Sequence, residues 1–178
     1  MEHRVRRDAI ALSPIKAIEE NSLASCLKVL LATVQDFAGC VQGAHWNVTG
    51  DDFPQYHKFF GKIYEDVSGS VDDLAENIRK LGDFPPSRLS ELISLSALPP
   101  RVEEQDEEGE ENDSETDAEE LVGYLENENR AVLQQIKVCI SAASGSEYQG
   151  ILNFLADRQN MHMKWAWQLK ASMEVEED

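Results

Sequence analysis

The chain has 178 residues, which is enough for one domain with a sizeable core and too few for two comfortable ones. Its formal net charge of −18 opposes nonspecific DNA binding, which depends on Lys and Arg neutralising phosphates, so DNA binding is expected to be weak or absent. The sequence shows no apolar signal core at its start and no run of about 18 apolar residues, so we expect a soluble cytoplasmic protein without a membrane segment.

The negative charge is concentrated rather than spread over the chain. Twelve Asp or Glu residues and no Lys or Arg lie between Glu103 and Glu120. We expect residues 101–117 to form a solvated acidic loop inserted into the domain, and residues 175–178 to form an acidic tail. Attraction of cations or of a cationic partner is the alternative role for the acidic loop.

Residues 1–20 are expected to form a polar amino-terminal tail ahead of a single domain at residues 21–174. The tail contains a basic cluster, whose members are Arg4, Arg6 and Arg7. A solubilising role is favoured for this cluster, and a weak contact with nucleic acid is the alternative.

Two long helices are predicted in the first half of the chain. Over residues 22–47, apolar residues recur at steps of three and four, which is typical of a helix with one buried face. Residues 48–52 are typical of a loop, and Pro54 suits the first turn of a second helix. That helix is expected to run to Leu81, where Gly82 ends it.

A short helix over about residues 89–95 is predicted in the long connection that follows. A third long helix is expected to begin at Thr116 or Asp117, and a fourth to follow the break at Ser144 and Gly145. Four long helices with almost no strand signal indicate an all-α four-helix bundle, with the short helix in a crossover connection.

The three cysteines are Cys26, Cys40 and Cys139, and they form no CxxC pair. Each lies in an apolar, helix-like stretch, where a buried thiol packs as a small hydrophobe. A reducing cytoplasmic setting explains them more easily than a disulfide framework does.

Four side chains suited to metal binding lie around the first loop and along the second helix. His45 and His57 are twelve residues apart and flank the predicted loop, so they can approach one another. Asp72 and Glu76 are four residues apart and therefore share one face of the helix. Imidazole nitrogen with carboxylate oxygen is a suitable donor set for iron, although zinc or manganese would also accept it.

The reach along the second helix decides how these ligands can combine. His57 and Asp72 are separated by about 22 Å at 1.5 Å per residue, whereas metal–ligand bonds are about 2 Å long. The two residues therefore cannot share a metal within one helix. Antiparallel packing of two copies would bring the histidine end of one helix to the acidic end of the other, so a single site would require a homo-oligomer.

The letters HWNVTG at residues 45–50, with Phe53 and His57, followed by DDLAENIRKLG at residues 72–82, resemble the signature of the Dps mini-ferritins, the DNA-binding proteins from starved cells. The resemblance covers residues 20–98 and 117–173. It implies a ferritin-like fold and a hollow dodecamer that oxidises Fe(II) with hydrogen peroxide or oxygen and stores the ferric mineral inside.

The resemblance also implies which residues bind and oxidise the iron. His45 and His57 would come from one subunit, and Asp72 and Glu76 from its partner. Trp46 would lie beside the site, where the family places an aromatic side chain thought to quench radicals.

The chain departs from the family pattern at Gly61, four residues after His57, where the family usually has an acidic ligand. This departure puts the second iron position in question, and water, Glu65 or Asp66 could substitute there. Gly61 and Gly69 each cost about 1 kcal/mol relative to Ala inside a helix, and close helix packing is the interpretation we favour for both.

Some of the aromatic and charged side chains have plainer interpretations. Trp46 could pack in the core without a redox role. His162, Trp165 and Trp167 are expected to be core or interface groups of the last helix, and Asp73 an exposed charge.

The sequence therefore predicts an iron-storage ferroxidase, in which Fe(II) is oxidised between subunits and the ferric mineral is held in the shell. The absence of any Glu-x-x-His motif argues against the di-iron site of the larger ferritins. The alternative function is a Dps-like structural or DNA-associated shell whose ferroxidase activity is weakened or absent because of Gly61.

Overall fold

The computed structural model describes residues 22–99, 117–145 and 147–173. The expected tails at 1–20 and 175–178 lie outside the described residues, as do the basic cluster and, apart from Asp117, the expected acidic loop at 101–117. The described residues form six helices and no strand, which confirms the predicted all-α fold.

Helix α1 (Leu23–Asn47) is the most deeply buried element of the bundle. It begins at Ser22, whose hydroxyl accepts a hydrogen bond from the amide of Ser25, as an N-cap does. By length and composition α1 could cross a membrane, which the sequence analysis did not anticipate. More than half of its apolar stretch is buried inside the bundle, so its apolar composition is explained by its place in the core.

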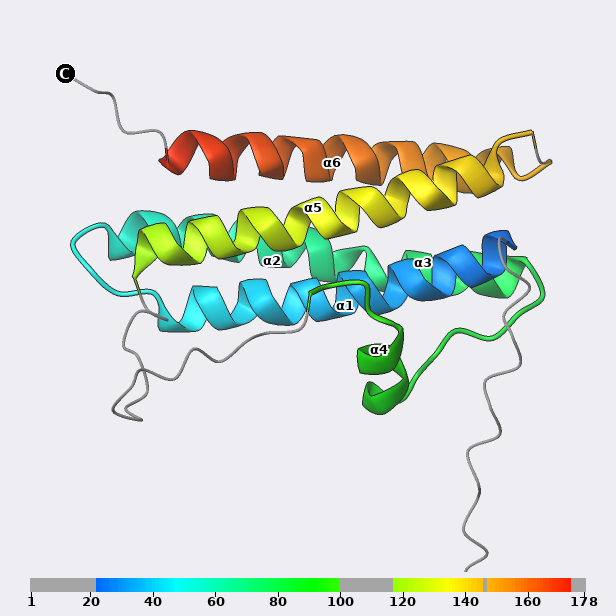
Figure 1. The fold of residues 1–178 in the computed structure, drawn as a ribbon, viewed down its shortest axis with the longest axis horizontal. Helices are drawn as coiled ribbons and strands as arrows, with labels where there is room; N and C mark the ends of the chain where they lie inside the picture. Colours follow the sequence, from blue (N-terminus) through cyan, green and yellow to red (C-terminus); the bar gives the residue numbers. More distant parts are fainter. Residues whose placement is uncertain (1–21, 100–116, 146, 174–178) are drawn as a thin grey trace, which may run out of the picture.

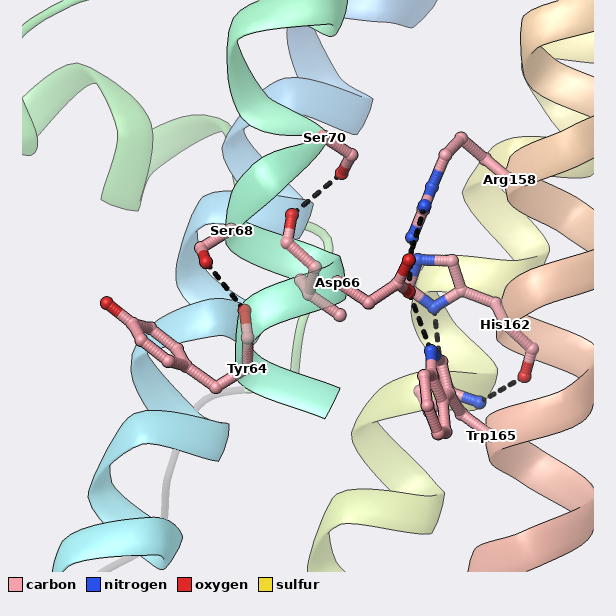
Figure 2. A network of polar contacts seen from close by, with 9 residues as sticks. Tyr64, Asp66, Ser68, Ser70, Arg158, His162 and Trp165 are labelled. Atoms are coloured by element: carbon pink, nitrogen blue, oxygen red, sulfur yellow. Dashed lines mark hydrogen bonds and ion pairs between the residues drawn. The ribbon is translucent and has the colours of Figure 1, made fainter. Parts of the chain in front are cut away.

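The second predicted helix is broken in two, as α2 (Phe53–Gly69) and α3 (Val71–Lys80). At the break the hydroxyl of Ser68 donates to the carbonyl of Tyr64 at 2.6 Å, and that of Ser70 donates to the carbonyl of Val67 at 2.7 Å (Figure 2). Such hydroxyls compete for helix carbonyls, and Gly69 between them adds no helix preference. The continuous helix expected over residues 54–81 is therefore wrong at this junction.

The crossover contains the predicted short helix as α4 (Leu89–Leu95), and the structure shows that it packs on α1. After α4 the chain is attached to α1 by the amide of Ala97, which donates to the hydroxyl of Thr33 at 3.0 Å. Helix α5 (Ala118–Ala143) begins at Asp117, whose carboxylate accepts from the amides of Glu119 and Glu120, as the sequence predicts. Helix α6 (Gln149–Met173) completes the bundle.

Figure 1 shows the directions in which these helices run. Helix α1 runs antiparallel to α2 and α3 and also to α5, and α6 runs antiparallel to α5. Because α5 runs in the same direction as α2 and α3, the chain must return along the whole bundle between them, which explains the long crossover. The α1–α2 loop lies at one end of the bundle, and α3 lies at the other.

The core is formed by apolar side chains from all four long segments, and fully buried examples are Phe37, Phe60, Ile63, Leu125 and Leu155. Complete burial of one such side chain stabilises the folded state by about 1.5–3 kcal/mol. The packing of these side chains fixes the position of the end of α1 relative to the start of α2, and the two histidines described next lie at these helix ends.

Candidate metal centre

The last turn of α1 and the first turns of α2 bring His45 and His57 together. The loop between the helices turns sharply at Gly50, whose φ of +101° is one that glycine adopts without strain. Pro54 in the first turn of α2 fixes the direction in which that helix starts. The sequence prediction that the two histidines are neighbours is confirmed by their ring centroids, which are 3.8 Å apart with the planes tilted by 21°.

Each histidine is held by the backbone of the other. Nδ1 of His45 donates to the carbonyl of His57 at 2.7 Å, and Nδ1 of His57 donates to the carbonyl of His45 at 2.6 Å. A carbonyl oxygen can only accept, so in the neutral ring the proton lies on Nδ1 and the lone pair on Nε2. This is the arrangement found in metal-binding histidines, in which a second contact fixes the tautomer and the ring orientation.

Gly61 has a steric role in this histidine pair. A Cβ atom built on Gly61 would lie 3.1 Å from Cε1 and 3.2 Å from Nδ1 of His45, which is closer than side chains usually approach. The expected close packing at Gly61 is therefore against the imidazole of His45. At Gly69 an added Cβ would meet no atom of the described residues within 4 Å, so the close packing expected there is wrong for this part of the chain.

Asp72 and Glu76 are exposed on α3. No hydrogen bond or ion pair joins either carboxylate to another described residue of the chain. Helix α3 lies at the end of the bundle opposite the α1–α2 loop (Figure 1), so one chain does not bring these acids to the histidines. Within the described ranges, no three His, Cys, Asp or Glu side chains of one chain lie close enough to hold a metal.

Trp46 follows His45 at the end of α1 and is 66% exposed. The interpretation of Trp46 as a core residue is therefore wrong, because a side chain this exposed contributes little to the packing of its own bundle. Phe53, which stacks on His57 at 5.0 Å between ring centroids, is also 41% exposed. Two large aromatic side chains, one that follows His45 in the sequence and one that stacks on His57, are thus exposed, as at surfaces that another protein covers.

Asp66 is not available as a substitute for the missing acid. Figure 2 shows its carboxylate between α2 and α6, where Nη1 and Nη2 of Arg158 donate at 2.9 and 2.8 Å and Nε1 of Trp165 donates at 2.7 Å. Burial favours a higher pKa of Asp66, but the hydrogen bonds from Arg158 and Trp165 and the charge of Arg158 outweigh it and lower that pKa. The suggested role of Asp66 as a second iron ligand is therefore wrong, while Glu65 remains exposed.

His162 belongs to the same network and is fully buried. The amide nitrogen of Asn129 donates to the carbonyl of His162 at 2.9 Å, so the amide oxygen accepts from Nδ1 at 2.6 Å. Nε2 of His162 is buried and has no hydrogen-bond partner among the described residues. Burial, aided by the charge of Arg158 and opposed by that of Asp66, lowers the pKa of His162 to about 3.

The core prediction for the last helix is confirmed for His162 and for Trp165, which is 5% exposed. Trp167 is 67% exposed, so it does not belong to the core of this chain. The partners of these residues were not visible in the sequence. Arg158 lies 92 positions after Asp66, and neither residue stands in a motif that connects them.

The comparisons with known proteins agree with this architecture. A model of the ferritin-like domain family matches residues 27–176. An uncharacterised protein of Haemophilus influenzae is 26% identical over 169 residues, which are 95% of this chain and 97% of that protein. A DNA protection during starvation protein of Porphyromonas gingivalis is 32% identical over 87 residues, which are 47% of this chain and 55% of that protein.

Among solved structures, the crystal structure of a Dps protein from Vibrio cholerae, described as a member of a broad superfamily of ferritin-like diiron-carboxylate proteins, superposes with a TM-score of 0.74. The two sequences are 26% identical, and the match covers 85% of this chain and 89% of that one. Because the family match spans most of the chain and the helices follow the same course, this chain belongs to the ferritin-like family and is a Dps-like mini-ferritin.

Proposed function

We propose that the chain assembles into a hollow homo-oligomeric shell, a dodecamer, that oxidises Fe(II) at sites between paired subunits and stores the ferric mineral inside. Each site would combine His45 and His57 of one subunit with Asp72 and Glu76 of the other. The role of the family in iron storage and protection supports this proposal. Iron is the substrate and the stored product in this scheme.

The observation that carries the proposal is the reciprocal locking of the two histidines. Their Nδ1 atoms are used by backbone carbonyls, so each ring keeps an Nε2 lone pair as a ligand for a cation. Two neutral imidazoles supply no negative charge, and Fe(II) binding is favoured by carboxylate oxygens as well. Asp72 and Glu76 are exposed and can be supplied to the histidines of a second copy.

The proposed chemistry is a one-electron oxidation of each iron. Hydrogen peroxide accepts two electrons and two protons to give two water molecules, so two Fe(II) ions are oxidised for each peroxide consumed. Molecular oxygen, the alternative oxidant, accepts four electrons. Trp46 lies next to the histidine pair in the sequence and is exposed, so it could supply an electron to a radical by-product before that radical escapes.

The remaining parts of the proposal concern location and DNA. We place the protein in the cytoplasm, where reduced iron is available as substrate. A net charge of −18 makes DNA binding weak at physiological salt. A mobility shift with duplex DNA that persists at physiological salt would contradict this last point.

Fe(II) oxidation followed by absorbance in the near ultraviolet tests the catalytic role. His45→Ala combined with His57→Ala should abolish the rapid phase, because both nitrogen ligands are lost. Asp73→Ala is the matched control, since Asp73 is an exposed acid beside Asp72 and is not assigned to the site. An unchanged rate in the double histidine variant would exclude this site as the ferroxidase.

The second candidate function is a Dps-like structural or DNA-associated shell with weakened or absent ferroxidase activity. It is favoured by Gly61, which supplies no carboxylate, and by Asp66, whose carboxylate is already held by Arg158 and Trp165. Anaerobic titration with Fe(II) separates the two candidates. Stoichiometric binding that depends on the histidine pair supports the ferroxidase, and no binding supports the structural shell.

A further inference from the structure

Two of the three cysteines lie against each other inside the bundle. Cys26 is near the start of α1 and Cys139 is near the end of α5, and the antiparallel course of these helices brings the two residues to the same end (Figure 1). Their side chains are close enough for each thiol to affect the other. Nε2 of Gln135, one turn before Cys139, donates to the carbonyl of Cys26 at 3.2 Å and approaches Sγ of Cys139 at 3.9 Å.

The two thiols differ in their access to solvent. Cys26 is 8% exposed and lines a surface cavity of about 360 Å³, which is also lined by Gln134, Lys137, Val138, Ser141 and Ala142. Cys139 is fully buried behind it. A small oxidant that enters the cavity can therefore reach Cys26, and Cys139 is then the nearest group that can react with oxidised Cys26.

We propose that Cys26 and Cys139 form a redox-active dithiol, which a hydroperoxide, with hydrogen peroxide as the smallest example, converts to an intrachain disulfide between α1 and α5. The inference does not depend on iron or on the proposed ferroxidase site. This proposal also differs from the prediction made from the sequence, which was that all three cysteines pack as small hydrophobic side chains.

The reaction takes place in two balanced steps. The sulfur of Cys26, after loss of its proton, attacks one oxygen of the peroxide, so the O–O bond breaks and a sulfenic acid and one water are formed. The sulfur of Cys139 then attacks the sulfenic sulfur, and the hydroxyl leaves as a second water. In total the two thiols lose two electrons and two protons, and the peroxide gains them.

The surroundings make both thiols weak nucleophiles, because burial raises the pKa of Cys139 as well as that of Cys26, and the second step is favoured only by the position of Cys139 beside Cys26. Burial raises the pKa of Cys26, and the neighbouring side chain of Cys139 offsets part of that rise, so the thiolate is a minor species. Once the sulfenic acid forms, Cys139 is already in contact with it. Cys40 is elsewhere on α1, where its sulfur accepts a hydrogen bond from the hydroxyl of Tyr124 at 3.0 Å, so it provides an internal control.

The test uses the full-length assembled protein, kept metal-free with a chelator and treated with hydrogen peroxide over a time course. At each time point a sample is unfolded in the presence of an alkylating agent, so that every remaining thiol is labelled, and the peptides are mapped by mass spectrometry. We expect two of the three thiols to be lost together as a peptide pair that links Cys26 to Cys139. Mixing labelled and unlabelled chains before oxidation should show that the link lies within one chain.

Variants make the order of the two steps visible. In Cys139→Ser the sulfenic acid on Cys26 should persist and be trapped by dimedone, whereas in Cys26→Ser the thiol of Cys139 should stay alkylatable. Cys40→Ser is the control and should form the disulfide as the unmodified protein does. If Cys40 reacts first, or if Cys26 proceeds to sulfinic acid while Cys139 stays alkylatable, the proposal is overturned even where a variant fails to fold.

Discussion

His162 should make the stability of the bundle depend on pH in a way that one substitution can remove. The folded environment lowers the pKa of His162 to about 3, whereas an unfolded histidine has its ordinary pKa of 6.5. Because the folded pKa is the lower one, the unfolded chain binds the proton more tightly. The contribution of His162 to stability is therefore complete above pH 6.5 and is lost as the pH falls from there toward 3.

The size of the effect follows from the two pKa values and from the geometry. Between about pH 7.5 and about pH 5, preferential protonation of the unfolded chain lowers the free energy of unfolding by about 2 kcal/mol. The geometric reason is that a second proton would have to lie on Nε2, which is buried and has no acceptor among the described residues. The Nδ1 proton is already donated to Asn129.

The assay is urea unfolding of the parent chain and of His162→Asn at both pH values, with metal chelated and protein concentration held constant. The amide nitrogen of Asn can replace Nδ1 as the donor to Asn129, but it does not titrate. The substitution itself lowers the free energy of unfolding at both pH values. The informative quantity is, for each protein, the difference between its free energies of unfolding at the two pH values. We expect that difference to be smaller in His162→Asn by about 2 kcal/mol. Equal losses in the two proteins would refute the assignment of His162 as a buried neutral histidine.

Two further substitutions test the rest of the structure. Asp66→Asn leaves the 12% exposed side chain of Arg158 without its counter-ion, so the free energy of unfolding in urea at neutral pH should fall by about 3 kcal/mol, and a loss below about 1 kcal/mol would contradict the network. Gly61→Ala places a methyl group against His45 and should slow Fe(II) oxidation about tenfold, as disturbed ligand support does. Gly69→Ala is its control, because the added methyl group meets no atom of the described residues within 4 Å, and equal rates in the two variants would exclude the steric role of Gly61.

The parts of the fold that depend on local patterns could be predicted from the sequence. The apolar period located the long helices, the turn residues located the first loop, and Asp117 was one of the two residues expected to begin α5. The proximity of His45 and His57 followed from their positions around a tight loop and is confirmed. These features depend on residues near one another in the chain, and local sequence therefore carries the information.

The features that were missed depend on contacts between distant residues or on side-chain detail. The break at Ser70 results from hydroxyls that bond back to helix carbonyls, which the apolar period does not record. The role of Asp66 is decided by Arg158 on another helix, so its spacing from His57 could not reveal it. Gly61 acts through the ring of His45, sixteen residues earlier, and only the packed structure shows that contact.

The measurement that tests the central proposal most directly is a mixing experiment with two inactive variants. One variant carries His45→Ala with His57→Ala, and the other carries Asp72→Ala with Glu76→Ala. In a mixed pair, one site combines intact histidines with intact acids and the other site loses both, so random reassembly at equal amounts restores about a quarter of the sites. The control mixes the parent chain with a variant that carries all four substitutions.

We predict that each variant alone has no rapid Fe(II) oxidation, and that the dissociated and reassembled mixture regains about a quarter of the parent rate. A mixture that stays inactive, although labelled subunits show that the two variants have exchanged, would contradict a site shared between two chains.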